Sequence, residues 1–108
     1  KDMKSEKNKQ IEELQMLENH LHYILAQKQA LQSELNEINN AVEELASSDD
    51  EVYKIVSGIM IKSAREKLKI ELKDKKKILN SKIEAVEKQE KLLEKRASEL
   101  KNEVINKY

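Results

Sequence analysis

Hydrophobic residues recur at alternating steps of three and four along the first 46 residues of the chain. Such steps place side chains on one narrow stripe of a helix, and a stripe of two positions in every seven is typical of a coiled coil with one partner helix. The pattern therefore predicts a helix over about residues 5–46. Nine of the ten positions in its seam are apolar, and the seam reads Leu14, Leu17, Leu21, Ile24, Lys28, Leu31, Leu35, Ile38, Val42 and Leu45.

A second repeat of seven residues predicts another helix over about residues 64–107. The stretch Ser63-Ala64-Arg65-Glu66 matches a capping box, in which a serine hydroxyl and a glutamate carboxylate accept hydrogen bonds from free backbone N–H groups. We therefore expect Ser63 to cap this helix. Its d positions are Leu72, Leu79, Val86, Leu93 and Leu100, and its a positions are Lys76, Ile83, Glu90, Ala97 and Val104.

Between the two helices, residues 52–62 break the pattern. They are rich in β-branched and aromatic residues and contain Gly58, the only glycine of the chain. This composition predicts a β-hairpin that turns at Ser57-Gly58, because glycine adopts positive φ without steric cost. Val56 then pairs with Ile59, and Lys54 pairs with Ile61.

The predicted hairpin carries apolar side chains on both of its faces. Two strands alone are only marginally stable in water, and a two-helix coiled coil is too narrow to cover them. We therefore expect the hairpin to assemble with other chains, and the alternative is a hairpin folded over the end of the coiled coil in a monomer. One face holds Val52, Val56, Ile59 and Ile61, and the other holds Tyr53, Ile55 and Met60.

The charges of the two helical segments favour an antiparallel pair within one chain. Residues 1–46 hold five lysines and nine acidic residues, a net of −4, whereas residues 63–108 hold fourteen basic and nine acidic residues, a net of +5. Folding back sets Lys28 and Glu90, two polar seam positions, at the same level. A polar pair in an apolar seam penalises slipped alignments, so we expect these residues to fix the register. The alternative is that each side chain reaches water independently.

The composition argues against several classes of function. The absence of cysteine excludes a thiolate metal site and is in keeping with a cytoplasmic location, and no apolar run approaches the about 20 residues that cross a bilayer. His20 and His22 lie two apart and point away from each other on a helix, so they do not suggest a metal site. The zero net charge argues against nucleic acid as a partner. We expect no catalysis, no cofactor and no membrane contact.

The order helix, short linker, single hairpin, helix resembles the prefoldin family, and within it the beta class of archaeal subunits. The resemblance covers nearly the whole chain and implies a mainly α protein: one domain, 1–108, with a long antiparallel two-helix coiled coil and a central β-hairpin that joins an intersubunit β-barrel. The stretches that carry it are Gln27-Lys28-Gln29-Ala30-Leu31-Gln32, Ala41-Val42-Glu43-Glu44-Leu45 and Val52-Tyr53-Lys54-Ile55-Val56-Ser57-Gly58.

The resemblance also implies a partner and a function. The expected complex is a hexamer of two alpha and four beta subunits that holds unfolded client proteins at the coiled-coil tips and passes them to a group II chaperonin without ATP. A structural coiled-coil adaptor or spacer that oligomerises through the hairpin and binds one defined partner is the alternative function.

The resemblance places the client contacts before about Leu25 and after about Leu92. Independently, large apolar residues lie off the seam in the same half of the first helix, and exposed apolar clusters usually mark binding. The alternative is that Leu25 and Leu92 only widen the seam. The candidate client-binding residues are Ile11, Leu14, Met16, Leu17, Tyr23, Leu25, Leu92, Leu100, Val104, Ile105 and Tyr108.

Overall fold

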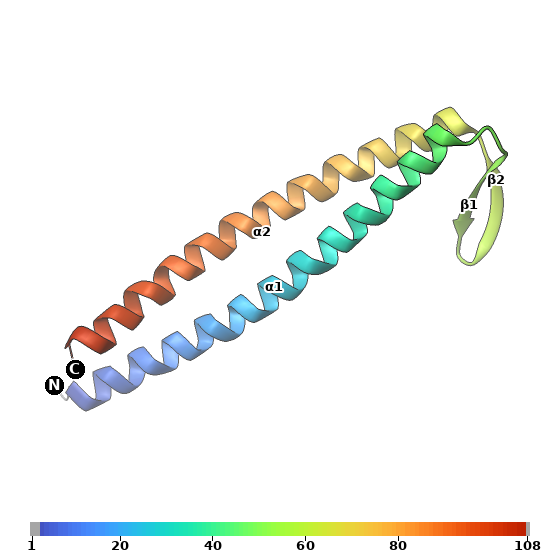
Figure 1. The fold of residues 1–108 in the computed structure, drawn as a ribbon. Coiled ribbons are helices and arrows are strands. Elements are labelled where there is room, and N and C mark those ends of the chain that lie inside the picture. The colour runs from blue at the N-terminus through green and yellow to red at the C-terminus, as the bar shows by residue number, and fades with distance from the viewer. Residues whose placement is uncertain (1–2, 108) are drawn as a thin grey trace. The chain divides into compact units, whose positions relative to one another are not determined.

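The computed structural model describes residues 3–107 and contains two long helices with a β-hairpin between them. Helix α1 (Met3–Ser47) is followed by strands β1 (Val52–Val56) and β2 (Ile59–Ser63) and by helix α2 (Arg65–Lys107), as Figure 1 shows. The chain has no proline, and its single glycine lies in the hairpin, so no helix breaker interrupts either helix. The predicted mainly α fold with one central hairpin is confirmed.

The chain forms two compact units, and each helix contributes to both of them. The described part of Lys1–Ala30 and Glu84–Tyr108 makes up one unit, which we call the terminal unit. The other, which we call the hairpin unit, is Leu31–Ile83 and contains both strands. Since the hairpin reverses the chain, each unit contains one segment of α1 and one antiparallel segment of α2.

The buried apolar residues occupy one heptad position. Six apolar side chains are buried among the described residues, and all six are d positions of the predicted seams. The a positions are half-buried or exposed, and among the apolar residues at these positions Val42 is the exposed one. A buried leucine, isoleucine or valine contributes about 1.5–3 kcal/mol, so these residues are the main apolar contribution to the pairing. They are Ile24, Ile38, Leu45, Leu79, Val86 and Leu100.

The hairpin has the predicted register and turn. Val56 pairs with Ile59 and Lys54 with Ile61 in an antiparallel ladder. Ser57 and Gly58 have φ values of 51° and 79°, and positive φ at both central residues is the mark of a type I′ turn. A side-chain carbon at Gly58 would meet no atom within 4 Å, so glycine is favoured there by backbone conformation and not by lack of space.

The start of α2 differs from the prediction by one residue. Ser63 belongs to β2 and pairs with Val52, whereas the first helical hydrogen bond runs from the N–H of Leu68 to the carbonyl of Ala64, over 3.0 Å. Ala64 therefore holds the N-cap position, and the capping box predicted for Ser63 is wrong. The ladder with Val52 keeps the backbone of Ser63 extended and ends one residue before the helix.

Candidate functional site

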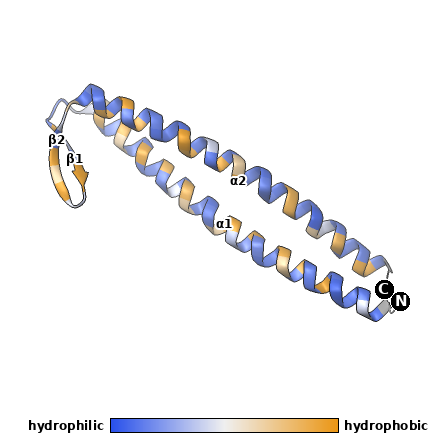
Figure 2. Cartoon of the chain, turned by 180° about the vertical axis from the view of Figure 1, so that it is seen from behind, coloured by the Kyte–Doolittle hydropathy of each residue, from blue (hydrophilic) through white to orange (hydrophobic). Residues whose placement is uncertain are grey.

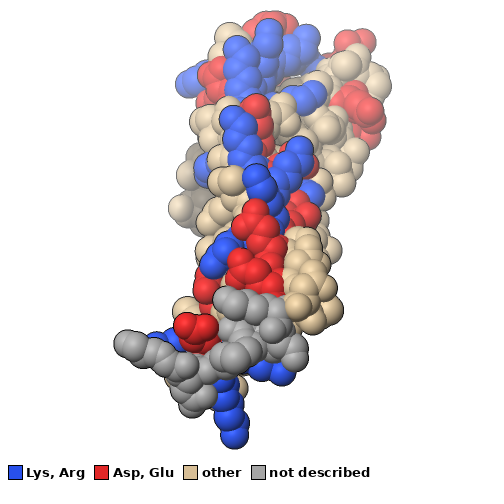
Figure 3. Space-filling view, turned by 90° about the vertical axis from the view of Figure 1, so that its left-hand side faces the viewer, with Lys and Arg blue, Asp and Glu red and all other residues tan. Residues whose placement is uncertain are grey.

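The terminal unit exposes large apolar side chains outside the seam. Met16 on α1 is 71% exposed, and Leu92 and Ile105 on α2 are 69% and 71% exposed. Tyr23 and Leu25 are exposed as well. Figure 3 views the structure from the side where helix α1 begins and helix α2 ends, and it shows uncharged side chains between acidic and basic ones. Apolar surface is thus open to solvent in the unit where the sequence predicts client binding.

The other candidate residues of this region are less accessible. Ile11, Leu14, Leu17 and Val104 are half-buried, and the last three are seam positions. Leu100 is 1% exposed, because it is a d position of the seam, and it offers no surface to a client in this conformation, contrary to expectation. Tyr108 lies outside the described residues.

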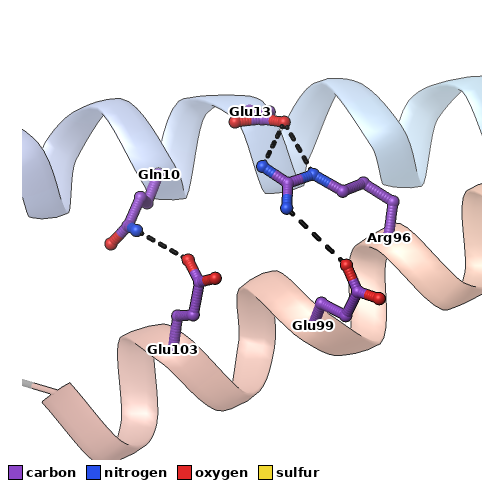
Figure 4. A network of polar contacts seen from close by, with 5 residues as sticks. All are labelled: Gln10, Glu13, Arg96, Glu99 and Glu103. Atoms are coloured by element: carbon purple, nitrogen blue, oxygen red, sulfur yellow. Dashed lines mark hydrogen bonds and ion pairs between the residues drawn. The ribbon is translucent and has the colours of Figure 1, made fainter.

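One flank of the terminal unit is closed by polar contacts between the helices (Figure 4). The guanidinium group of Arg96 on α2 donates to the Glu13 carboxylate of α1 over 3.2 Å and lies 3.8 Å from Glu99. Nearby, the amide of Gln10 donates to the Glu103 carboxylate over 2.9 Å. Exposed ion pairs contribute only about 0–1 kcal/mol each, so these contacts orient the helices more than they stabilise them.

The structure brings Lys28 and Glu90 together inside the seam. The Lys28 ammonium donates to the Glu90 carboxylate over 3.0 Å and lies 3.7 Å from Glu87, with 22% of the Lys28 side chain and 17% of the Glu90 side chain exposed. The hydrogen bond to Glu90 raises the pKa of Lys28, because it favours the charged ammonium. The two side chains therefore do not reach water independently, and Glu87, one turn before Glu90, is a further partner that the sequence did not suggest.

The hairpin exposes apolar side chains on both of its faces. Val52 alone among its large apolar residues is half-buried. Figure 2 shows hydrophobic residues along both strands. In this conformation the hairpin therefore does not bury its apolar side chains against the helices. The exposed side chains are Tyr53, Ile55, Val56, Ile59, Met60 and Ile61.

Ion pairs hold the base of the hairpin. The Lys54 ammonium donates to the Glu71 carboxylate of α2 over 2.9 Å, and this hydrogen bond lowers the pKa of Glu71. The Glu51 carboxylate accepts from the Tyr53 hydroxyl over 2.7 Å and lies 3.1 Å from the Lys62 ammonium. Its pKa is lowered first by the bond from Tyr53 and then by Lys62. Charged contacts thus orient the hairpin while its apolar side chains stay in the open.

Arg65 joins the two helices beside the hairpin, a role that the sequence analysis did not identify. Its guanidinium group donates to the carbonyl of Leu45 and, over 2.8 Å, to the carbonyl of Asp50. The last turn of α1 contains no basic residue of its own, although helix C-termini carry free carbonyls and favour a cation. That missing cation, together with an arginine at the start of the next helix, was the signal available in the sequence.

Comparison with known proteins identifies the family. The family model described as "Prefoldin subunit" matches residues 8–108. The chain belongs to the prefoldin family. Prefoldin is a family of chaperone subunits and not of enzymes.

Individual prefoldin relatives agree with the family model. The chain is 35% identical to the prefoldin subunit beta of Saccharolobus islandicus strain L.S.2.15, over 92% of this chain and 82% of that protein. It is 36% identical to the prefoldin subunit beta of Sulfurisphaera tokodaii, over 92% and 83% of the two chains. The crystal structure of the prefoldin beta subunit from Thermococcus strain KS-1 superposes with a TM-score of 0.85 at 32% identity and covers 92% of this chain and 89% of that one.

Two further structural features bear on the sequence-based expectations. Over residues 3–107, no helix is long and apolar enough to cross a bilayer. Within the same residues, no three side chains of histidine, cysteine, aspartate or glutamate gather as a metal site would require.

Proposed function

We propose that the chain is a subunit of an ATP-independent holdase that captures unfolded proteins on the terminal unit. The observation that carries this proposal is the exposure of Met16, Leu92 and Ile105, each about 70% open to solvent, in a chain of a chaperone family. Unfolded proteins expose the apolar side chains that native proteins bury, so an open apolar surface is complementary to them. In the cytoplasm such a surface would hold an unfolded client protein until a chaperonin folds it.

The chemistry of these side chains suits clients of many shapes. Methionine has an unbranched, flexible side chain that repacks around different partners. Each contact is weak, because apolar burial contributes only about 25 cal/mol per Å². Several terminal units on one complex would grip a client by multivalency, in which linked weak contacts bind much more tightly than any single one.

The hairpin would gather those units. Its exposed apolar faces and the unpaired outer edges of β1 and β2 support pairing with the hairpins of other subunits. A closed β-barrel would bury the apolar faces and would pair the backbone groups of the outer edges. The relatives from Saccharolobus islandicus and Sulfurisphaera tokodaii are both named prefoldin subunit beta, so the partner we propose is an alpha-class subunit. The proposed complex contains two alpha and four beta subunits and delivers its clients to a group II chaperonin.

Aggregation assays on several unrelated clients test this function. Three chemically denatured proteins of different folds are diluted with the chain, alone and co-expressed with an alpha-class subunit, in the absence of ATP. A holdase delays the light scattering of all three in proportion to its concentration. An adaptor for one folded partner protects none of them, and that result would overturn the proposal.

A further inference from the structure

An apolar groove with an acidic rim runs along one flank of the terminal unit. Two adjoining cavities of about 300 and 290 Å³ share Glu18, Leu21 and Glu94 in their walls. The first cavity is also lined by Leu25 and the second by Ala97, so leucine and alanine side chains supply apolar surface along both. The remaining lining residues are His22, Glu90, Ser98 and Lys101.

The two flanks of the terminal unit differ in how their carboxylates are paired. On one flank, Arg96 of α2 neutralises Glu13 of α1. In the groove, Glu18 of α1 and Glu94 of α2 line the same cavities, and within the part of the chain that the structure describes neither forms an ion pair. Lys101 lines only the second cavity and lies beyond ion-pair distance of both glutamates. Carboxylates from both helices therefore stand over an apolar wall, and neither of the two is engaged in an ion pair.

The seam itself shows how this unit receives a cation in apolar surroundings. Lys28 emerges between leucine and isoleucine positions, and its ammonium is bound by Glu90, which also lines the groove. The stem of a lysine covers apolar surface while its charged end meets a carboxylate. A lysine or arginine that entered the groove from another chain would find the same two elements, an apolar wall and glutamates at its rim.

We propose that this groove selects, among unfolded client segments, those in which lysine or arginine alternates with large apolar residues. The inference rests on the proposed holdase function and adds a chemical class of client to it. Apolar residues of the segment lie against Leu21 and Leu25, and its cations pair with Glu18 and Glu94. Acidic segments of equal hydrophobicity are disfavoured by repulsion from the same carboxylates.

Fluorescence anisotropy with matched peptides tests the proposal on the full chain in the assembly that it forms. Three short labelled peptides alternate leucine with lysine, with glutamine or with glutamate, and a fourth peptide replaces leucine by serine and keeps lysine. An exposed ion pair strengthens binding by about fivefold at most. We expect the leucine–lysine peptide to bind about fivefold more tightly than the leucine–glutamine peptide, and this ratio to fall toward one in about 0.5 M salt.

A pair of isosteric double variants locates the effect. Glu18→Gln with Glu94→Gln should abolish the preference for lysine over glutamine. The matched control, Glu12→Gln with Glu84→Gln, removes the same charge from exposed positions of the same unit that do not line the groove, and it should keep the preference. The inference is overturned if the two double variants behave alike, or if the serine–lysine peptide binds as tightly as the leucine–lysine peptide.

The same experiment separates this inference from the function on which it rests. Binding of the leucine–glutamine peptide and suppression of aggregation report the holdase function. If both are present without any preference for lysine, the groove proposal fails and the holdase proposal stands. If no unfolded peptide binds and only a folded partner does, both proposals fail.

Discussion

Replacing Leu100 and Ile105 by alanine, one at a time, separates the seam from the exposed surface of the terminal unit. Both side chains have four carbons and lie five residues apart on α2, yet Leu100 is 1% exposed and Ile105 is 71% exposed. The two substitutions therefore form a matched comparison, in which the chemistry removed is nearly the same and only its burial differs.

The expected magnitudes follow from that difference in burial. Leu100→Ala removes three buried carbon groups, worth about 0.8 kcal/mol each, or about 2.4 kcal/mol together. Core substitutions of this kind cost about 2–5 kcal/mol with the cavity included. The seam of a two-helix pair is bordered by solvent and can partly close, so we expect a loss of about 2–3 kcal/mol. Ile105→Ala should change the free energy of unfolding by no more than about 0.5 kcal/mol.

Urea unfolding followed by far-ultraviolet circular dichroism measures both values. Protein concentration must be the same throughout, because assembly adds to apparent stability. The midpoint should fall for Leu100→Ala with little change in the urea dependence of the free energy, and it should stay in place for Ile105→Ala. Equal losses in the two variants would show that Ile105 is packed in solution and would refute its assignment to an open binding surface.

Three further predictions concern the register, the hairpin and acid. Glu90→Leu should keep or raise thermal stability while allowing slipped alignments, so cysteines placed at one level of α1 and α2 should cross-link less selectively; unchanged selectivity would remove the register role of Lys28 and Glu90. Val56→Asp should disperse the assembly into smaller species in light scattering, and an unchanged mass would argue against hairpin-mediated assembly. The pKa values of Glu51 and Glu71 lie below the usual 4.5. Their ionised carboxylates therefore stabilise the fold above that pH, and this stabilisation is lost as the pH falls through their pKa values in the folded chain. When the pH is lowered below about 4, the urea midpoint should fall less in the Glu51→Gln/Glu71→Gln variant than in the unaltered chain.

The helices, the hairpin and the buried residues could be predicted from the sequence because each depends on a local pattern. In a two-helix pair the heptad alone decides which side chains face the partner, so Ile24 and Leu79 were identified as seam residues without any knowledge of distant contacts. Likewise, Ser57-Gly58 determines the turn type and hence the pairing of Val56 with Ile59.

The features that sequence reasoning missed depend on side-chain reach and on single-residue offsets. Ser63 does not cap helix α2 as predicted, because the strand ladder continues one residue further than the composition suggested. The contacts of Arg65 with the carbonyls of Leu45 and Asp50 join segments that are 20 and 15 residues away. Leu100 is a d position, so the heptad already predicts its burial, and its inclusion among the client-binding residues conflicts with that pattern and with its 1% exposure.

The central claim is that exposed apolar side chains of the terminal unit hold unfolded proteins. Aggregation of two unrelated denatured proteins, measured by light scattering without ATP, tests it with two matched double variants of α2. Leu92→Ser with Ile105→Ser alters the terminal unit, and Ile70→Ser with Ile78→Ser alters two isoleucines of the hairpin unit that are 63% and 55% exposed.

At unchanged assembly mass, the variant of the terminal unit should lose most of its protection of both clients, and the variant of the hairpin unit should keep it. Full protection by the Leu92→Ser/Ile105→Ser variant, or equal loss in both variants, would contradict the account.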